Sequence, residues 1–250
     1  MGRVAGARTL WRLTPQAATL LIAAALAWVV ILAWSPLGRA MEGRMEFVLP
    51  AFLITWTVMM AAMMLPSVAP VASLYSRSIS ERRAVRLTQF TGGYLVVWAS
   101  AGVLAFALGA FIGGLADANP SLGIAAGAGA YLVCGLYQLS PLKSRCLQHC
   151  RSPLSLVLKY GSYRGSLRDF RVGLHHGGYC LGCCWSLMVV LLALGAMSVV
   201  PMVILAAIVI TEKLSPKGEN FSRLVGVGSL ALAVATIWIP DLAPGFRPSM

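Results

Sequence analysis

Charge is what this 250-residue chain has least of, because Lys, Arg, Asp and Glu together make up 11% of it while 58% is hydrophobic. A soluble domain carries about a quarter charged residues. The scarcity therefore excludes a soluble domain with its own core, and long apolar runs indicate an integral membrane protein. The alternating segments of a membrane β-barrel are missing too. Since only helices and closed barrels satisfy the backbone in lipid, we expect an all-α, polytopic helical membrane protein.

Acidic residues are scarcer still, since 8 Asp and Glu stand against 20 Lys and Arg, for a formal net charge of +12. The basic residues gather between apolar runs, which is the pattern of membrane orientation, so we expect no nucleic-acid partner. Because the phosphate-binding pattern G-x-x-x-x-G-K-[ST] is missing and no soluble domain could hold it, we expect no ATP-driven pump. The first apolar run lacks a small-residue cleavage site, and we expect it to remain as the first helix.

The apolar runs predict a single helical membrane domain over residues 1–250 with about seven transmembrane helices. A break at Gly195, followed by Pro201, divides the most continuous apolar stretch into two short helices, because proline suits the first turn of a new helix. Seven spans put every basic segment, including the loop 140–178, on the side of the N-terminus, which the positive-inside rule makes cytoplasmic. Within that loop, residues 152–160 are amphipathic and are expected at the membrane interface. The approximate spans are 17–34, 47–74, 92–115, 122–139, 183–196, 199–213 and 224–239.

Four of the eleven methionines fall within six positions of the second predicted span. On an α-helix, Met59, Met60, Met63 and Met64 lie within an arc of about 140°, stacked one turn apart. Thioethers are soft, neutral ligands that suit Cu(I). Methionine is also a common flexible filler of apolar cores. The run is therefore a candidate methionine ladder for Cu(I), with core packing as the alternative.

Three of the six cysteines gather at the expected start of the fifth span. If the helix begins by Cys180, then Cys180, Cys183 and Cys184, with Met188 one turn further, also share an arc of about 140°. Thiolates bind Cu(I) and Zn²⁺ strongly, which makes these residues the first candidates for a metal site. Neighbouring glycines would let the backbone close around an ion or simply turn into the membrane. They are Gly177, Gly178 and Gly182.

A second cysteine pair, Cys146 and Cys150, lies in the basic loop and shares a face if that segment is helical. The pair would bridge a soft ion, with His149 as a third donor, whereas the alternatives are ordinary cytosolic cysteines or palmitoylation sites. His175 is a supporting candidate ligand. Its neighbour His176 is also a supporting candidate ligand, with an interfacial histidine as the favoured alternative.

Glu212 and Lys213 end the sixth predicted span on the cytoplasmic side. An acid at the end of a membrane helix is a functional candidate. The alternative is a local ion pair of Glu212 with Lys213, Lys143 or Arg145. Because cytosolic thiols are kept reduced, we expect no disulfide framework, and the cysteines would form a mouth above the deeper methionines.

At these residues the chain resembles a bacterial family of predicted metal-binding integral membrane proteins, a domain of unknown function that is sometimes labelled copper chaperone. The matching segments are Trp56–Ser67, Tyr137–Pro153 and Gly173–Trp185, and Leu187–Met188 and Glu212–Lys213 also fit. The resemblance covers most of the chain from the second helix onward. It implies a multi-pass protein of the bacterial inner membrane that binds a metal.

Together these observations favour a protein that binds Cu(I), or alternatively zinc, and delivers it to a cuproprotein or metallochaperone recipient, with no enzymatic activity of its own. One alternative is a membrane thiol oxidoreductase that uses Cys180-x-x-Cys183 with a quinone. That enzyme, acting on secreted proteins, would need its cysteine pair on the outer side. The other is a non-metal transporter or scaffold in which cysteine and methionine only pack. The oligomeric state is not predicted.

Overall fold

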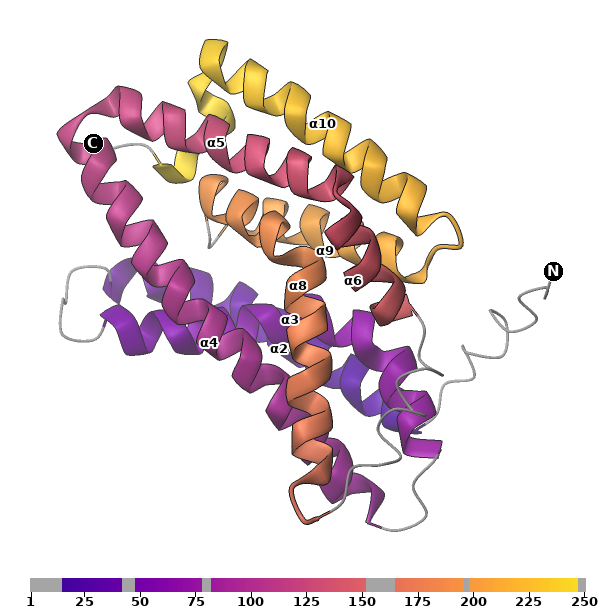
Figure 1. Ribbon diagram of the computed structural model, residues 1–250. Coiled ribbons are helices and arrows are strands. Elements are labelled where there is room, and N and C mark those ends of the chain that lie inside the picture. Colours follow the sequence, from indigo (N-terminus) through magenta and orange to yellow (C-terminus); the bar gives the residue numbers. More distant parts are fainter. Residues whose placement is uncertain (1–14, 42–47, 78–81, 152–164, 196–197, 247–250) are drawn as a thin grey trace.

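The computed structural model describes residues 15–41, 48–77, 82–151, 165–195 and 198–246 (Figure 1). Within these ranges the chain forms eight α-helices and two short 3-10 helices, and no strand occurs in them, so the expected all-α class is confirmed. The helices are α2 (Pro15–Met41), α3 (Val48–Arg77), α4 (Arg83–Ala118), α5 (Pro120–Leu139), α6 (Pro141–Arg151), α8 (Arg168–Ala193), α9 (Val199–Leu214), α10 (Gly218–Trp238), η2 (Pro240–Leu242) and η3 (Pro244–Phe246).

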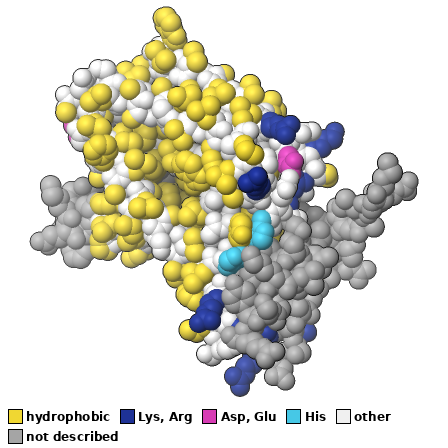
Figure 2. All heavy atoms as spheres, in the orientation of Figure 1, with side chains coloured by type: hydrophobic (Ala, Val, Ile, Leu, Met, Phe, Trp, Pro, Cys, Tyr) yellow, Lys and Arg dark blue, Asp and Glu magenta, His cyan; other side chains and the backbone are white. Residues whose placement is uncertain are grey.

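Six of these helices are long and apolar enough to cross a membrane. Large hydrophobic side chains such as Leu104 and Trp238 stand exposed on their outer surfaces, at 73% and 82%, as lipid contact requires. Hydrophobic side chains cover the face over α4, α5 and α10, while Lys and Arg gather toward one side and the lower end (Figure 2). These features indicate a multi-pass membrane protein. The six are α2, α3, α4, α5, α8 and α10.

The expected spans 17–34, 92–115 and 122–139 lie inside α2, α4 and α5, and 47–74 and 224–239 each begin or end one residue beyond α3 and α10. The larger differences concern the basic segment. Two helices, α6 and the first part of α8, occupy much of the expected loop 140–178. The helix expected from residue 183 begins fifteen residues earlier, at Arg168. The amphipathic segment 152–160 lies outside the described residues.

Glycines explain why α8 starts so early. A side chain at Gly173 would collide with the carbonyl oxygen of Phe90 in α4, and one at Gly93 would collide with that of Phe170 in α8. Gly177 likewise packs against Val97, 3.1 Å from an added Cβ. Small residues at these positions let the two backbones approach closely, as in membrane helix pairs. Of the two roles expected for the glycines near the cysteines, the turn into the membrane is wrong, because these glycines lie within the helix.

Helices α4 and α8 run parallel, since Asp169 near the start of α8 pairs with Arg86 near the start of α4, and Gly177 further along α8 packs against Val97 further along α4. An ion pair between Arg86 Nε and Asp169 Oδ2, 2.9 Å apart, joins their N-terminal ends. Tyr75, near the end of α3, donates a hydrogen bond to the same carboxylate. The beginnings of α4 and α8 and the end of α3 therefore lie at one end of the molecule.

The break at Gly195 falls where the sequence predicts it. Helix α8 ends at Ala193, Gly195 adopts a positive φ of 95°, and α9 begins at Val199 with Pro201 in its first turn. The end of α8 lies against Gly245, beyond the C-terminal end of α10. Because α9 then finishes beside Gly218, at the start of α10, it returns the chain along the length of α10.

Candidate metal site

Four buried cysteines from two helices lie together at the centre of the molecule. Cys180 is the thirteenth of the 26 residues of α8, with Cys183 and Cys184 one turn further along. These three side chains are 0–1% exposed, and Cys150 near the end of α6 is 7% exposed. The Sγ atoms of Cys150 and Cys183 are 3.9 Å apart, and Cys183 also interacts with the thiols of Cys180 and Cys184. We call these four residues the thiol cluster; all six cysteines of the chain are free thiols.

The separation between Cys150 and Cys183 suits a shared ion. Two thiolates that each lie about 2.3 Å from one metal are up to about 4.6 Å apart. The other two thiols are engaged elsewhere. Cys184 donates to the carbonyl oxygen of Cys180 at 2.9 Å, and the Sγ of Cys180 lies 3.0 Å from the Tyr94 hydroxyl.

A lysine from α9 brings a positive charge to the thiol cluster. Lys213 Nζ donates to Cys180 Sγ at 2.9 Å and to Ser67 Oγ of α3 at 3.1 Å. Lys213 is buried, at 8% exposure. An ammonium group in this position compensates the negative charge that a thiolate carries, and a buried charge without such a partner is costly.

Glu212 pairs with Lys143, as one of the sequence alternatives predicts. Lys143 Nζ lies 2.7 Å from Glu212 Oε2, and both side chains are 1% exposed. Gln138 at the end of α5 donates to the other carboxylate oxygen at 2.9 Å. Lys143 also donates to the main-chain carbonyl of Cys183. The pair thereby fixes α6 and α9 to the part of α8 that carries the thiol cluster.

The four methionines of α3 are buried in the core, at 0–3% exposure, and so is Met188 of α8, at 4%. Packing alone would produce the same burial, so a ligand role for the ladder stays a prediction. Their link to the thiol cluster is Ser67, one turn beyond Met63 and Met64. Its hydroxyl donates to the carbonyl of Met64 at 2.8 Å and accepts from Lys213.

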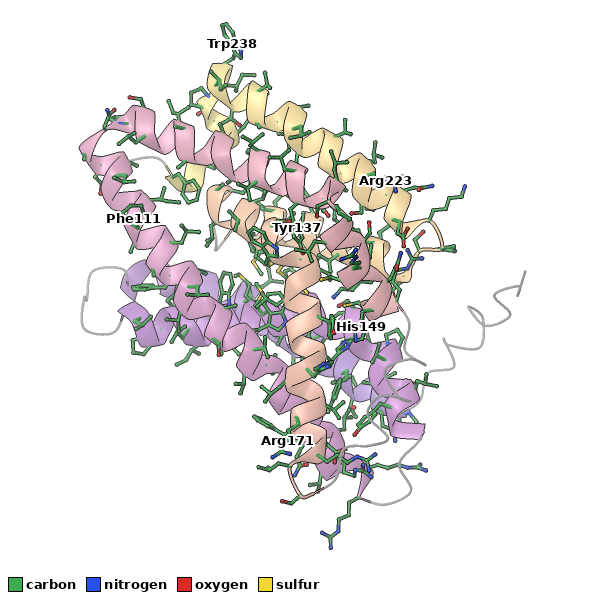
Figure 3. All side chains as sticks on the ribbon, in the orientation of Figure 1. Phe111, Tyr137, His149, Arg171, Arg223 and Trp238 are labelled. Atoms are coloured by element: carbon green, nitrogen blue, oxygen red, sulfur yellow. The ribbon has the colours of Figure 1, made fainter. Side chains whose placement is uncertain are left out.

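Cys146 and His175 lie at the margin of the site and are partly exposed. His149, labelled in Figure 3, stacks on Tyr179 with ring centroids 3.6 Å apart, and His175 meets the same tyrosine edge-on at 5.0 Å. Burial raises the pKa of the Cys146 thiol. For Cys150, the hydrogen bond to Cys183 and burial together hold the thiol pKa well above its usual range.

For His176 the structure contradicts the favoured interfacial interpretation. It is not interfacial but buried, at 3% exposure, and its ring packs near Phe90 and Tyr94 with centroids 6.1 Å away in each case. The sequence does contain a signal for His176. Positions 176, 180 and 183 are four and three residues apart, so they share one face of a helix. No such spacing relates the cysteines to Lys213, Tyr94 or Ser67, since other helices bring these residues to the thiol cluster.

In the part of the chain that the structure describes, no three His, Cys, Asp or Glu side chains already surround one common point as a metal ion would require. The thiols are instead linked in pairs, with Cys183 in contact with each of the others. A two-coordinate soft ion needs only one such pair. The arrangement therefore supports binding by a pair of thiolates, to which a further ligand would have to move.

A protein-family model described as PpoB2, copper chaperone, matches residues 53–236 of the chain. The match begins in α3, just before the methionine ladder, and ends in α10, so it includes the thiol cluster. No curated protein and no solved structure gives a significant match to the chain.

Proposed function

Because the chain belongs to the PpoB2 copper chaperone family, whose model spans residues 53–236, we propose that it binds Cu(I) within the bacterial inner membrane and passes it to a recipient protein. The observation that carries the proposal is the approach of Cys150 and Cys183 to 3.9 Å inside a buried cluster of four thiols. Soft thiolates bind Cu(I) and zinc strongly, and the neighbouring thioethers of methionine favour Cu(I). The recipient would be a cuproprotein or another metallochaperone.

The membrane arrangement that fits this proposal has seven spans, with α9 as the seventh. Its 16 residues make a helix of about 24 Å, which is short for a hydrocarbon core of about 30 Å. The path of α9 supports its role as a span, since α9 connects the end of α8 beside Gly245 with the start of α10 at Gly218. The parallel α4 and α8 then both begin on the cytoplasmic side, together with the N-terminus, in one membrane domain.

In this orientation the thiol cluster lies level with the cytoplasmic ends of α5, α9 and α10. Gln138, Glu212 and Ser222 mark these ends, and all three belong to one hydrogen-bonded network. Cys146 and His175 would form the outer margin, where an incoming ion first meets the protein. The ladder of Met59, Met60, Met63 and Met64 in α3, with Met188 of α8, would receive the ion beyond the thiols.

The proposal is tested by the metal that the wild-type protein retains. Protein purified under reducing conditions is offered copper and zinc in equal amounts, and both are measured after removal of free metal. We expect copper to be retained in clear excess over zinc, because thiolate and thioether donors favour Cu(I). Retention of zinc alone would contradict the assignment of the metal, and retention of neither metal would contradict a metal site.

The same preparation separates the proposal from a thiol oxidoreductase. Such an enzyme would lose two titratable thiols, as one disulfide, for each quinone that is reduced to the quinol. Loss of thiols in step with quinone reduction would favour the oxidoreductase over the carrier.

A further inference from the structure

His176 presents a buried polar atom that the fold does not satisfy. Its side chain is 97% removed from solvent, as its 3% exposure shows, and Nδ1 has no hydrogen-bond partner among the described residues. Burying a polar group without a partner costs about 1–3 kcal/mol in proteins. Such atoms are uncommon in native structures and call for an explanation.

His176 lies on the same helix as three of the four residues of the thiol cluster. It lies four residues before Cys180 and seven before Cys183, so the three residues share one face of α8. Its ring packs near Tyr94, whose hydroxyl contacts the sulfur of Cys180. Cys183 and Lys213 are also among the groups that act on the imidazole electrostatically.

The sulfur atoms of Cys150 and Cys183 are 3.9 Å apart, a separation at which both could bind one ion. Cys184 is committed to a backbone carbonyl, and Cys180 to Lys213 and Tyr94. A neutral imidazole is a suitable third donor for copper, because it binds without losing a proton.

Charge also favours histidine over a third thiolate. Cu(I) with two thiolates carries one negative charge, which the nearby ammonium of Lys213 balances; Lys213 acts electrostatically on both Cys150 and Cys183. Lys143 and Glu212 balance each other. A neutral imidazole leaves the total at zero, whereas a third thiolate would leave an unbalanced negative charge in a buried site, which is costly.

We propose that His176 is a nitrogen ligand of this site and completes a three-coordinate Cu(I) centre with Cys150 and Cys183. The assignment rests on the proposed function. On binding, two thiols lose their protons to solvent and form two Cu–S bonds, while the imidazole contributes a lone pair and copper stays in the +1 state. The ring has to move toward the sulfur pair, because no three such donors already share one point among the described residues.

The test is X-ray absorption at the copper edge on purified, Cu(I)-loaded protein, together with affinity measured by competition with a chromophoric Cu(I) chelator. For wild type we expect one nitrogen and two sulfur neighbours. His176→Gln should lose the nitrogen neighbour and weaken the affinity by at least about tenfold, a loss that even outer-shell partners cause. Cys134→Ser, which changes a buried side chain of α5 outside the thiol cluster, is the control and should keep both properties.

A second variant covers the case in which His176→Gln does not fold. His176→Met offers a soft ligand of similar bulk, so we expect its spectrum to show three sulfur neighbours and its affinity to exceed that of any folded His176→Gln protein. Wild-type copper bound by sulfur alone, or a nitrogen neighbour that persists in both His176 variants, would overturn this inference only. A wild-type protein that binds no copper would overturn the proposed function itself.

Discussion

Replacing Lys143 with methionine should destabilise the protein more than replacing Lys143 and Glu212 together. In wild type the two charged groups are 2.7 Å apart and 1% exposed. Lys143→Met leaves a buried carboxylate whose remaining partner is the amide of Gln138. Removing one member of a buried ion pair costs about 3–5 kcal/mol.

The double variant Lys143→Met/Glu212→Gln removes the unpaired charge and should recover part of that loss. Neutral replacements of buried pairs are often close to wild type in stability. Recovery should be incomplete, because both variants also lose the hydrogen bond from Lys143 to the carbonyl of Cys183. That bond contributes about 1.5–3 kcal/mol, as hydrogen bonds from charged groups do.

The assay is thermal unfolding in detergent, followed by tryptophan fluorescence. For a chain of this size about 1 kcal/mol shifts Tm by about 2–4 °C, so the single variant should melt about 6–20 °C lower. Arg145→Met, an exposed basic residue of the same helix α6, is the control and should stay within about 0.5 kcal/mol. Equal losses in the single and double variants would refute the reasoning, because the cost would then not come from an unpaired charge.

Three further predictions concern other parts of the molecule. Burial raises the pKa of Cys146, so its alkylation should be slow at neutral pH and should accelerate up to a higher pH than an exposed thiol requires; a rate that levels off below pH 8 would contradict this. Gly173→Leu should destabilise the α4–α8 contact by more than about 1–3 kcal/mol, whereas Gly178→Leu, with open space around it, should melt near wild type. Met63→Leu with Met64→Leu should cost less than about 1.5 kcal/mol per residue, as volume-conserving core changes do, yet lower copper retention; unchanged retention would assign both methionines to packing.

The sequence predicted the class of fold because hydrophobic length and the scarcity of charge act locally along the chain. The break at Gly195 was equally visible, since a glycine followed by a proline ends one helix and starts another. The early start of α8 was not visible, because it depends on the close packing of Gly173 and Gly177 against α4, which is far away in the sequence.

The candidate site likewise combines features that local sequence predicts with features that depend on contacts between distant helices. The proximity of Cys180, Cys183 and Cys184 follows from helical spacing alone, whereas the approach of Cys150 depends on how α6 folds back onto α8. The sequence placed Lys213 beside Glu212, but their side chains have different partners in the structure. Lys213 contacts Cys180, and Glu212 pairs with Lys143. Contacts between distant helices set these pairings, and periodicity carries no information about them.

The central claim is that the thiols of α8 hold copper, and the most direct test is the copper bound per chain in Cys180→Ser/Cys183→Ser/Cys184→Ser. Cys134→Ser is the matched control, because Cys134 is a buried cysteine of α5 whose thiol accepts from Ser229 and lies outside the thiol cluster. The account predicts that the triple variant loses bound Cu(I) while Cys134→Ser retains the wild-type amount. Wild-type copper stoichiometry in the triple variant would contradict it.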